Sequence, residues 1–268
     1  MIQADFHCHT TFVDGAHSAE EMVLSAIEKG MKTLGISEHA HVPFDPECSL
    51  SLKDTLAYRQ EITRLKEKYK DQITLLCGIE MDYYAQDDPT AYDYVIGSVH
   101  YLNVNGNTYC VDLSPKETLR CIDEAFLGDY YAYAKCYFEH VAELKNKWNP
   151  NIIGHFDLLT KFQEKGVAFD LDHPIYNKAA EDAIKALAGC TFEVNTGAIS
   201  RGYRKEPYPA FPYLKSIREN GNLVLLSSDS HHRDTLLYQF NLAKELVHAA
   251  GFVTAGFVDG NGTEHIQF

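Results

Sequence analysis

Short apolar runs alternate with amphipathic stretches along the whole of this 268-residue chain. Seven runs have the length and the β-branched or aromatic content of buried strands; they span residues 2–7, 33–37, 73–79, 93–99, 151–156, 190–195 and 223–228. The stretches between them favour helices, at 18–30, 51–70, 116–148, 174–189, 209–220 and 234–250. Alternation of this kind predicts an α/β fold with a parallel sheet, either open or closed as a barrel.

Local signals support several of these boundaries. Ser18 and Glu21 form a capping-box pattern at the start of the first helix, and Gly30 stands where that helix should stop. The segment 252–268 resembles a hairpin around the stretch DGNG. No linker or low-complexity stretch interrupts the chain, so we expect one domain over 1–268, with an insertion at about 102–135 after the fourth strand.

Polar side chains stand at the carboxyl end of nearly every predicted strand, which is where sites collect in parallel α/β proteins. The stretch DFHCHTTF places His7 and His9 at alternate positions, so on a strand both side chains share one face. Cys8 and Cys77 point away from that face and are interpreted as core residues. The other strands end in SEHAH, GIEMD, SVHY, GHFD and SSDSHH, whereas the sixth ends in EVNTG.

These positions predict a metal centre. The candidate ligands are His7, His9, Asp14, His39, Glu80, His100, His155, Asp229 and His231. Imidazole nitrogens and carboxylate oxygens bind borderline divalent metals such as zinc, iron and manganese. Without a metal, the cost of burying so many polar groups would be uncompensated. The set is too large for one tetrahedral ion, so two or three ions bridged by a carboxylate are expected. His17 competes with Asp14 for the same ion.

Composition narrows the function. The net charge is −14 without a Lys/Arg-rich run, which argues against nucleic acid as a partner. No stretch approaches the roughly 20 apolar residues of a membrane span, and no export signal is visible at the start. The seven cysteines contain no CxxC pair, which indicates reduced thiols and a cytoplasmic protein.

The ordered motifs resemble the polymerase and histidinol phosphatase (PHP) superfamily over the whole chain. They are HxH with a following Asp, EH on the second strand, Glu on the third, then SVH, GHxD and a late SDxH. The resemblance implies a distorted (βα)7 barrel with its metal site at the carboxyl ends of the strands. It also implies catalytic roles for Asp229, Glu80 and His231.

The same resemblance implies three groups of ligands. One ion would be held by His7, His9, Glu80 and Asp229, a second by Glu80, His100 and His155, and a third by Asp14, His39 and His231. Two close metal ions suit hydrolysis of a phosphate ester, because they generate a bridging hydroxide at neutral pH and stabilise the leaving oxygen.

Within the superfamily, SVHYL, GHFDLLTKF and EVNTGAISRG are similar to the stand-alone histidinol phosphate phosphatases. The implied activity is hydrolysis of L-histidinol phosphate, a small phosphomonoester of histidine biosynthesis. Arg201 and Arg204 follow the sixth strand and are candidates for binding the phosphate, with Arg201 favoured. Acidic residues and tyrosines of the insertion could bind the ammonium and the imidazole. Asp112, Glu117, Asp123, Glu124 and Asp129 are the acidic candidates.

Three other functions fit the same sequence. The chain could be a nucleotide phosphoesterase or a protein-tyrosine phosphatase of the superfamily, or a metal-structured binding domain without turnover. A turnover assay on a small phosphomonoester separates the last from the enzymes.

Overall fold

The computed structural model of the chain describes residues 4–258 and 263–267, and it contains one seven-stranded parallel sheet. In spatial order the strands are β1 (Ala4–Asp5), β2 (Thr33–His39), β3 (Thr74–Asp82), β4 (Tyr94–Ser98), β7 (Ile152–Ile153), β8 (Thr191–Asn195) and β9 (Leu223–Ser227). Every named pair in this order is parallel, as the alternating pattern predicts.

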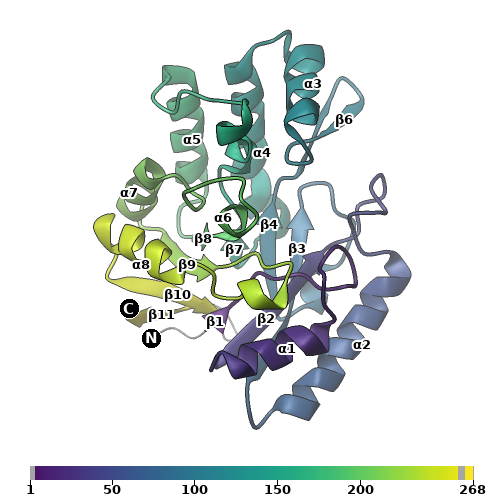
Figure 1. The fold of residues 1–268 in the computed structure, drawn as a ribbon. Coiled ribbons are helices and arrows are strands. Elements are labelled where there is room, and N and C mark those ends of the chain that lie inside the picture. Colours follow the sequence, from purple (N-terminus) through teal and green to yellow (C-terminus); the bar gives the residue numbers. More distant parts are fainter. Residues whose placement is uncertain (1–3, 259–262, 268) are drawn as a thin grey trace.

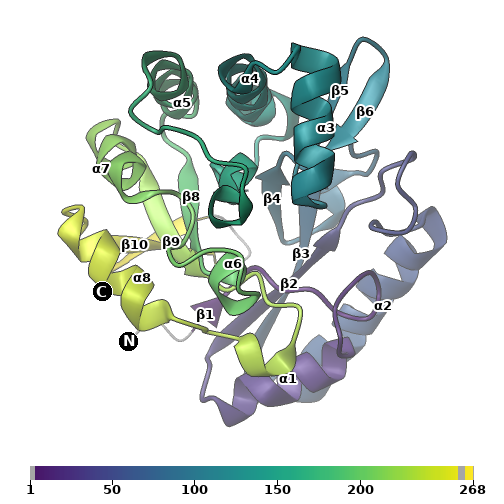
Figure 2. The ribbon, with the colours of Figure 1, turned by 45° about the horizontal axis from the view of Figure 1, so that its top comes forward.

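The two edges of the sheet meet beyond the ends of β1 and β9. Cys8 and Ser230 form a parallel bridge there, with the amide of His9 donating to the carbonyl of Ser230 at 2.8 Å. The sheet is therefore a nearly closed barrel, and the (βα)7 expectation is confirmed. Figure 2 looks toward this barrel with the helices arranged around it.

Helices cover the outside of the sheet (Figure 1). They are α1 (Ala19–Glu28), α2 (Leu52–Tyr69), α3 (Pro115–Phe126), α4 (Tyr130–Trp148), α5 (Pro174–Ala186), α6 (Gly197–Ser200), α7 (Phe211–Glu219) and α8 (Phe240–Ala249). The loops of the described residues contain 3-10 turns at η1 (Pro89–Ala91), η2 (Leu158–Thr160), η3 (Gln163–Lys165) and η4 (Arg233–Thr235). Among the described residues, no helix has the length and apolar content needed to cross a bilayer.

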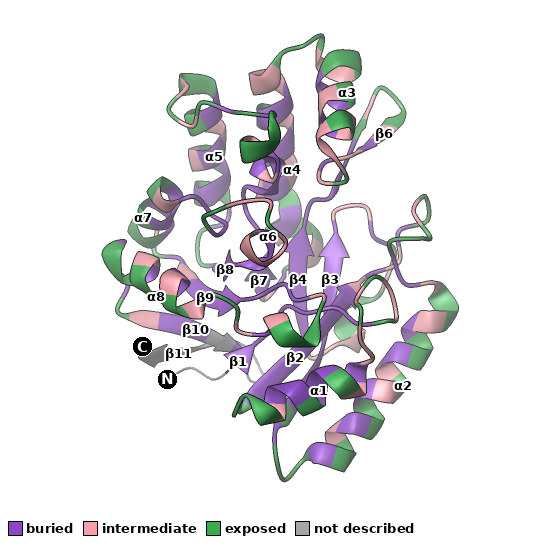
Figure 3. Cartoon of the chain, viewed as in Figure 1, coloured by how far each residue is buried: buried purple, intermediate pink, exposed green. Residues whose placement is uncertain are grey.

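The first helix shows how local sequence sets an element. The hydroxyl of Ser18 accepts a hydrogen bond from the amide of Glu21, and the carboxylate of Glu21 accepts one from the amide of Ser18. The predicted capping box is therefore present. Met22, Val23 and Ala26 form its buried face. Figure 3 shows the same division in the longer helices, with purple faces toward the sheet and green faces outward.

The long helix expected over 116–148 is two helices, α3 and α4. The chain turns between them at Leu127 and Gly128, which have φ of 55° and 81°. A helix cannot continue through left-handed backbone, and glycine adopts it at little cost. Asp129 then caps α4 by accepting from the amides of Tyr131 and Ala132. The rest of the insertion is an antiparallel hairpin of β5 (Tyr101–Val104) and β6 (Asn107–Cys110).

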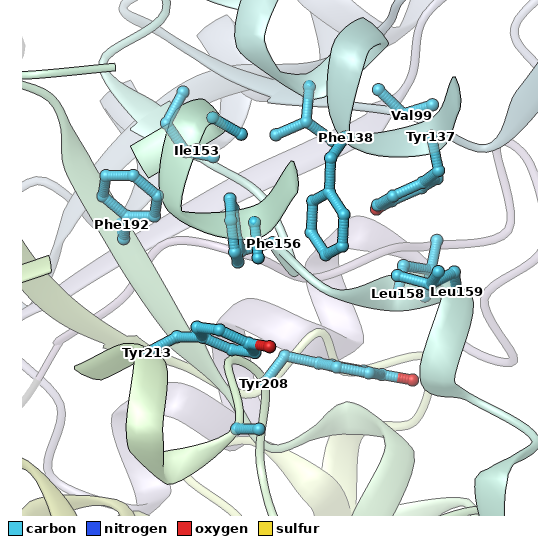
Figure 4. Close-up of a cluster of buried hydrophobic side chains, with 14 of the residues drawn as sticks. Val99, Tyr137, Phe138, Ile153, Phe156, Leu158, Leu159, Phe192, Tyr208 and Tyr213 are labelled. Atoms are coloured by element: carbon cyan, nitrogen blue, oxygen red, sulfur yellow. The ribbon is translucent and has the colours of Figure 1, made fainter. Parts of the chain in front are cut away.

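Two apolar layers hold the barrel in shape. Outside the sheet, Phe138 and Tyr213 pack on Phe156 (Figure 4). Their ring centroids lie 5.2 and 6.0 Å, respectively, from that of Phe156. Inside, Phe6, Leu76, Tyr94, Ile96, Ile152 and Leu225 belong to a separate buried cluster. Because this apolar cluster occupies the barrel interior, the polar residues lie beyond it, at the carboxyl ends of the strands.

A close approach inside the barrel requires glycine. The ring of Tyr94 lies against Gly35 and Gly78, where a Cβ would fall 2.2 Å from the tyrosine side chain. The hydroxyl of Tyr94 donates to the carbonyl of Phe6 at 2.6 Å. One aromatic side chain therefore occupies part of the barrel interior and links β4 to the segment that follows β1.

Three smaller expectations have clear outcomes. Cys8 and Cys77 are buried, as predicted for core residues. The carboxyl-terminal hairpin is confirmed by antiparallel pairing of β10 (Thr254–Val258) with β11 (Thr263–Gln267). Its turn at 259–262 and the first residues of the predicted strand 2–7 lie outside the described residues.

Candidate metal centre

The fold brings all nine candidate ligands to the carboxyl edge of the barrel. Two of them lie within strands, His39 at the end of β2 and Glu80 near the end of β3, and the others lie in the segments that follow β1, β4, β7 and β9. The sheet register explains part of this convergence, since His39 pairs directly with Glu80. Neighbouring parallel strands thus deliver their last polar side chains to one place.

Glu80 lies at the centre of the set. Its Oε1 is 2.9 Å from Nε2 of His155 and 3.4 Å from Nε2 of His100. Its Oε2 is 2.8 Å from Nδ1 of His39 and 3.3 Å from Nε2 of His7. Nε2 of His9 lies 3.7 Å from the same Oε2. One carboxylate therefore faces five imidazoles from four segments, which is the position that a bridging ligand requires.

Asp229 faces the two histidines of the first segment. Its Oδ1 is 3.7 Å from Nε2 of His7 and 3.4 Å from Nε2 of His9. The backbone of Asp229 has φ of 45°, in the left-handed region that non-glycine residues rarely adopt. Such a conformation costs about 1–3 kcal/mol, so the surrounding contacts must hold it in place. Gly197 allows the close approach, because a Cβ there would lie 2.8 Å from Cβ of Asp229.

Asp14 and not His17 completes the outer part of the set. Oδ2 of Asp14 is 3.1 Å from Nε2 of His231 and 3.8 Å from Nε2 of His39. His17 instead accepts from the amide of Arg233 and packs edge-on against His232. Loop conformation thus places the carboxylate of Asp14, and not the ring of His17, beside these two histidines.

Three groups of donor atoms are close enough to hold a metal ion within the described part of the chain. They are His9, Asp14, His39 and His231; His7, His9 and Asp229; and His39, Glu80 and His100. The expected grouping differs, since His9 and His39 each take part in two of these groups and Glu80 in one instead of two. His155 stands outside them but contacts Glu80 and His100 directly.

The electrostatics suit a cation. Burial opposes ionisation of Glu80, but His7, His100 and His39 outweigh it and hold the pKa of the carboxyl well below its usual range. Burial, together with the charges of His39 and His231, lowers the pKa of His9 to about 3. His9 is therefore neutral near pH 7, so one ring nitrogen carries the proton and the other has a lone pair available to a metal ion.

Unpartnered atoms provide the test of whether a metal fits. Buried polar atoms are normally hydrogen-bonded. Here Nε2 of His7, both ring nitrogens of His9 and Oε2 of Glu80 are buried without a hydrogen-bond partner. Nε2 of His7 and Nε2 of His9 face Oε2 of Glu80 at 3.3 and 3.7 Å. Nδ1 of His9 lies on the side of Asp14, 4.0 Å from its Oδ1. Imidazole nitrogens and carboxylate oxygens bind divalent metals, so the donor set fits such ions.

Arg201 reaches the centre, whereas Arg204 does not. The guanidinium of Arg201 donates to Oδ2 of Asp229 at 2.9 Å and to Nδ1 of His231 at 2.7 Å. Arg204 lies over the ring of Tyr208 and donates to the hydroxyl of Thr160. It lines neither of the two cavities described next.

Two contiguous cavities open at the centre. The histidine cavity, of about 190 Å³, is lined by Asp14, His39, Glu80, His100, Asp112, His155, Leu158, Lys161, Arg201, Tyr203, Asp229 and His231. The acidic cavity, of about 220 Å³, shares Asp14, His39, Glu80, His100, Asp112 and Lys161 with it and adds Ala40, Val42, Asp45, Cys48, Asp82, Tyr101, Cys110 and Leu113. The histidine cavity, with Arg201, Lys161 and the metal-binding atoms, thus adjoins an acidic cavity rich in carboxylates.

Several lining residues were not singled out from the sequence. Lys161 lies at the junction of the cavities and donates to Oδ2 of Asp112 at 2.9 Å. Asp45 comes from the loop after β2 and is held by the hydroxyl of Tyr101 at 2.6 Å. The thiols of Cys48 and Cys110 also line the acidic cavity. Burial raises the pKa of both, so neither is a thiolate at neutral pH.

Of the five acidic residues of the insertion, Asp112 alone lines the two cavities at the metal centre. Glu117 and Glu124 bind Arg120 on the surface of α3, and Asp129 caps α4. Asp123 is exposed on α3. The insertion therefore contributes one carboxylate to the site, through the segment between β6 and α3.

Comparison with known proteins agrees with this geometry. A family model described as PHP domain matches residues 5–197. A Schizosaccharomyces pombe protein named probable histidinol-phosphatase is 28% identical, over 91% of this chain and 86% of its own length. The Bacillus subtilis histidinol-phosphatase is 26% identical, over 90% of this chain and 97% of its own.

A solved structure shares the fold. The histidinol phosphate phosphatase of Lactococcus lactis, crystallised with zinc, L-histidinol and phosphate, has a TM-score of 0.72 to this chain. The two are 22% identical, and the match covers 98% of this chain and 99% of the other. At this identity the likeness establishes the fold and leaves substrate to be argued from the site.

Proposed function

Because the chain belongs to the PHP family, we propose that it is a metal-dependent phosphatase and that its substrate is L-histidinol phosphate. The observation that carries this proposal is the pair of contiguous cavities. One presents metal-binding atoms and Arg201, which suit a phosphate, and the other presents carboxylates, which suit a cationic leaving group. Full-length relatives named histidinol-phosphatase support the choice.

The nine ligands would hold two or three divalent ions of zinc, iron or manganese type. When bound, such ions activate water for attack on a phosphate ester and stabilise the charge of the leaving oxygen. The roles proposed for the protein are separate from this chemistry. Glu80 and Asp229 hold the donor set together through the contacts described above, and these two residues with His231 form the proposed catalytic group.

The hydrogen-bond partners of His231 determine which of its ring nitrogens carries the proton. A guanidinium only donates, so Nδ1 of His231 accepts from Arg201 and Nε2 carries the proton that Asp14 accepts. His231 can bind a metal through Nε2 only if Nδ1 donates instead to the Asp229 carbonyl, 3.1 Å away. Arg201 must then turn aside, which would free its guanidinium for a phosphate.

Positive charge for the phosphate comes from Arg201 and Lys161, which both line the histidine cavity. A guanidinium matches phosphate oxygens with two parallel hydrogen bonds, and a lysine adds a point charge. We assign the phosphate contact to Arg201 and not to Arg204, because Arg204 is largely buried against the ring of Tyr208 and lines neither cavity.

The leaving group would lie in the acidic cavity. Asp45, Asp82 and Asp112 face it in addition to Asp14 and Glu80, against the single ammonium of Lys161. An ammonium on the substrate would be attracted by this imbalance, whereas a second phosphate or a polynucleotide would be repelled. Val42, Tyr101 and Leu113 give the same cavity an apolar wall on which a ring could pack.

A reducing compartment fits the thiols. All seven cysteines are free, and three of them, Cys48, Cys110 and Cys136, are at least partly exposed. Unpaired cysteines of this number are typical of cytoplasmic proteins, in which thiols stay reduced. We therefore propose a cytoplasmic location.

A substrate panel on metal-replete protein tests this function. We expect the highest kcat/KM for L-histidinol phosphate and a lower value for its analogue without the amino group. The loss should be at least about tenfold, since an ion pair in a desolvated site is worth more than roughly 1.4 kcal/mol. The panel should also contain p-nitrophenyl phosphate, a nucleoside monophosphate and a phosphotyrosine peptide.

Other outcomes identify the alternatives. A faster reaction with the nucleotide or with the phosphotyrosine peptide would replace the proposed substrate by one of the other enzyme functions. No turnover of any panel member by metal-replete protein would favour a metal-structured binding domain. Equal rates for histidinol phosphate and its deaminated analogue would remove the role assigned to the acidic cavity.

A further inference from the structure

Strand β8 contributes no candidate ligand, yet it carries the most highly hydrogen-bonded carboxylate of the barrel interior among the described residues. Glu193 is fully buried, and donors from four residues occupy its two oxygens. Oε2 accepts from Nδ1 of His7 at 2.8 Å and from the hydroxyl of Ser227 at 2.6 Å. Oε1 accepts from the amide of His155 at 2.6 Å and from Nδ2 of Asn195 at 2.8 Å.

The orientation of Asn195 is determined by its own contacts. Its Oδ1 accepts from the amide of Gly197 at 2.8 Å, so Nδ2 must point toward the carboxylates. Nδ2 is also 3.3 Å from Oδ2 of Asp229. Glu193 and Asn195 together therefore touch three candidate ligands, His7, His155 and Asp229, which come from three other segments of the barrel.

We propose that Glu193 is a positioning residue that keeps Nε2 of His7 free to coordinate a metal ion. This inference rests on the metal site of the proposed function. A carboxylate oxygen can only accept, so His7 donates to it from Nδ1. In the neutral ring the remaining lone pair is then on Nε2, which faces Glu80 and Asp229 at 3.3 and 3.7 Å.

An amide at this position would reverse the arrangement. Both partners of Oε1 are obligate donors, because one is the backbone N–H of His155 and the other is the fixed amide nitrogen of Asn195. Glutamine would have to place its oxygen there and its NH2 group against His7. Nδ1 of His7 would then accept, and the ring proton would move to Nε2, where it blocks the metal-binding lone pair.

The test is zinc affinity, measured by competition with a chromophoric chelator on the full-length protein after metal removal. For Glu193→Gln we expect zinc binding about 10- to 100-fold weaker than in the wild type, the usual cost of losing a partner that orients a metal ligand. For Glu193→Ala we expect a smaller loss, because water in the vacated space can accept from Nδ1. A packing role predicts the opposite order, since Gln has the shape of Glu and Ala does not.

The matched control is Glu181→Gln, the same chemical change at a partly buried carboxylate that accepts only from the hydroxyl of Ser216, at 2.6 Å. It should bind zinc as the wild type does. Unchanged zinc affinity in Glu193→Gln, or a greater loss in Glu193→Ala than in Glu193→Gln, would overturn the inference while leaving the metal site intact. A wild-type protein that binds no zinc would instead overturn the proposed function, and this inference with it.

A double-mutant cycle keeps the inference testable if Glu193→Gln does not fold. Glu193→Ala should weaken zinc binding less in a His7→Gln background than in the wild type, because the contact it removes is already absent. Additive losses would show that the Glu193–His7 contact contributes nothing to zinc affinity, which contradicts the inference.

Discussion

Glu80→Gln is expected to lose bound metal and nearly all turnover. Its two oxygens face His155 and His100 on one side and His39 and His7 on the other. Glutamine keeps the shape but replaces one acceptor oxygen with a donor and removes the negative charge. Because losing even a partner of a ligand costs roughly 10- to 100-fold, loss of a shared ligand should lower kcat by more than about 10³-fold.

Metal analysis and turnover should be measured on the same Glu80→Gln preparation. Glu181→Gln is again the control, and it should retain wild-type metal content and kcat. The far-ultraviolet circular dichroism spectrum of both variants should match that of the wild type, because the change conserves volume. Full metal content with normal turnover in Glu80→Gln would remove the central role from this residue.

Arg201→Ala should lose transition-state stabilisation for the phosphoryl group. A charge-assisted pair in a largely desolvated site is worth about 2–4 kcal/mol, which corresponds to a fall in kcat/KM of roughly 30- to 1000-fold. Lysine at this position should restore only part of the loss, because a single ammonium cannot form two parallel hydrogen bonds. Steady-state kinetics on L-histidinol phosphate provide the measurement.

The Arg201 result must be separated from loss of metal, since this guanidinium also contacts Asp229 and His231. Metal content of Arg201→Ala should therefore be determined alongside its kinetics. Arg204→Ala is the matched control, because it removes a guanidinium near Asp157 but outside both cavities. It should lower the melting temperature clearly and kcat/KM only slightly. A kcat/KM within threefold of wild type for Arg201→Ala would assign the phosphate contact elsewhere.

The barrel and its ligand edge were predictable because their signals are local and repeated. Strand–helix alternation determines that the strands are parallel, and parallel strands direct their last residues to one edge. His7 and His9 follow from the period of two, which holds even though β1 itself ends at Asp5. The backbone beyond β1 stays extended enough for Cys8 to bridge Ser230, so the alternation of faces continues.

Contacts that depend on loops and on tertiary pairing were not predictable in the same way. The break at Leu127 and Gly128 divides one helical pattern into two helices, because left-handed backbone overrides the apolar periodicity. Asp45 reaches the cavity only because Tyr101, from the distant hairpin, holds it. The periodicity of the sequence predicts neither the helix break nor the contact between Asp45 and Tyr101.

The sixth strand illustrates a different limit. Its ending EVNTG lacks histidine, and the sequence predicts a phosphate contact from the arginines that follow it. Arg201 in that loop does line the histidine cavity, but Glu193 points into the barrel and binds His7. A carboxylate that supports ligands has the same appearance in sequence as one that is a ligand, and only its hydrogen-bond partners distinguish the two.

The central claim, that this PHP-family chain is a metal-dependent phosphatase for L-histidinol phosphate, is tested most directly by phosphate release during metal titration. Metal-free protein should be titrated with zinc or manganese while bound metal and turnover of L-histidinol phosphate are measured together. The account predicts no turnover without metal and full turnover only when more than one ion is bound per chain. Full turnover of the metal-free protein in the presence of chelator would contradict it.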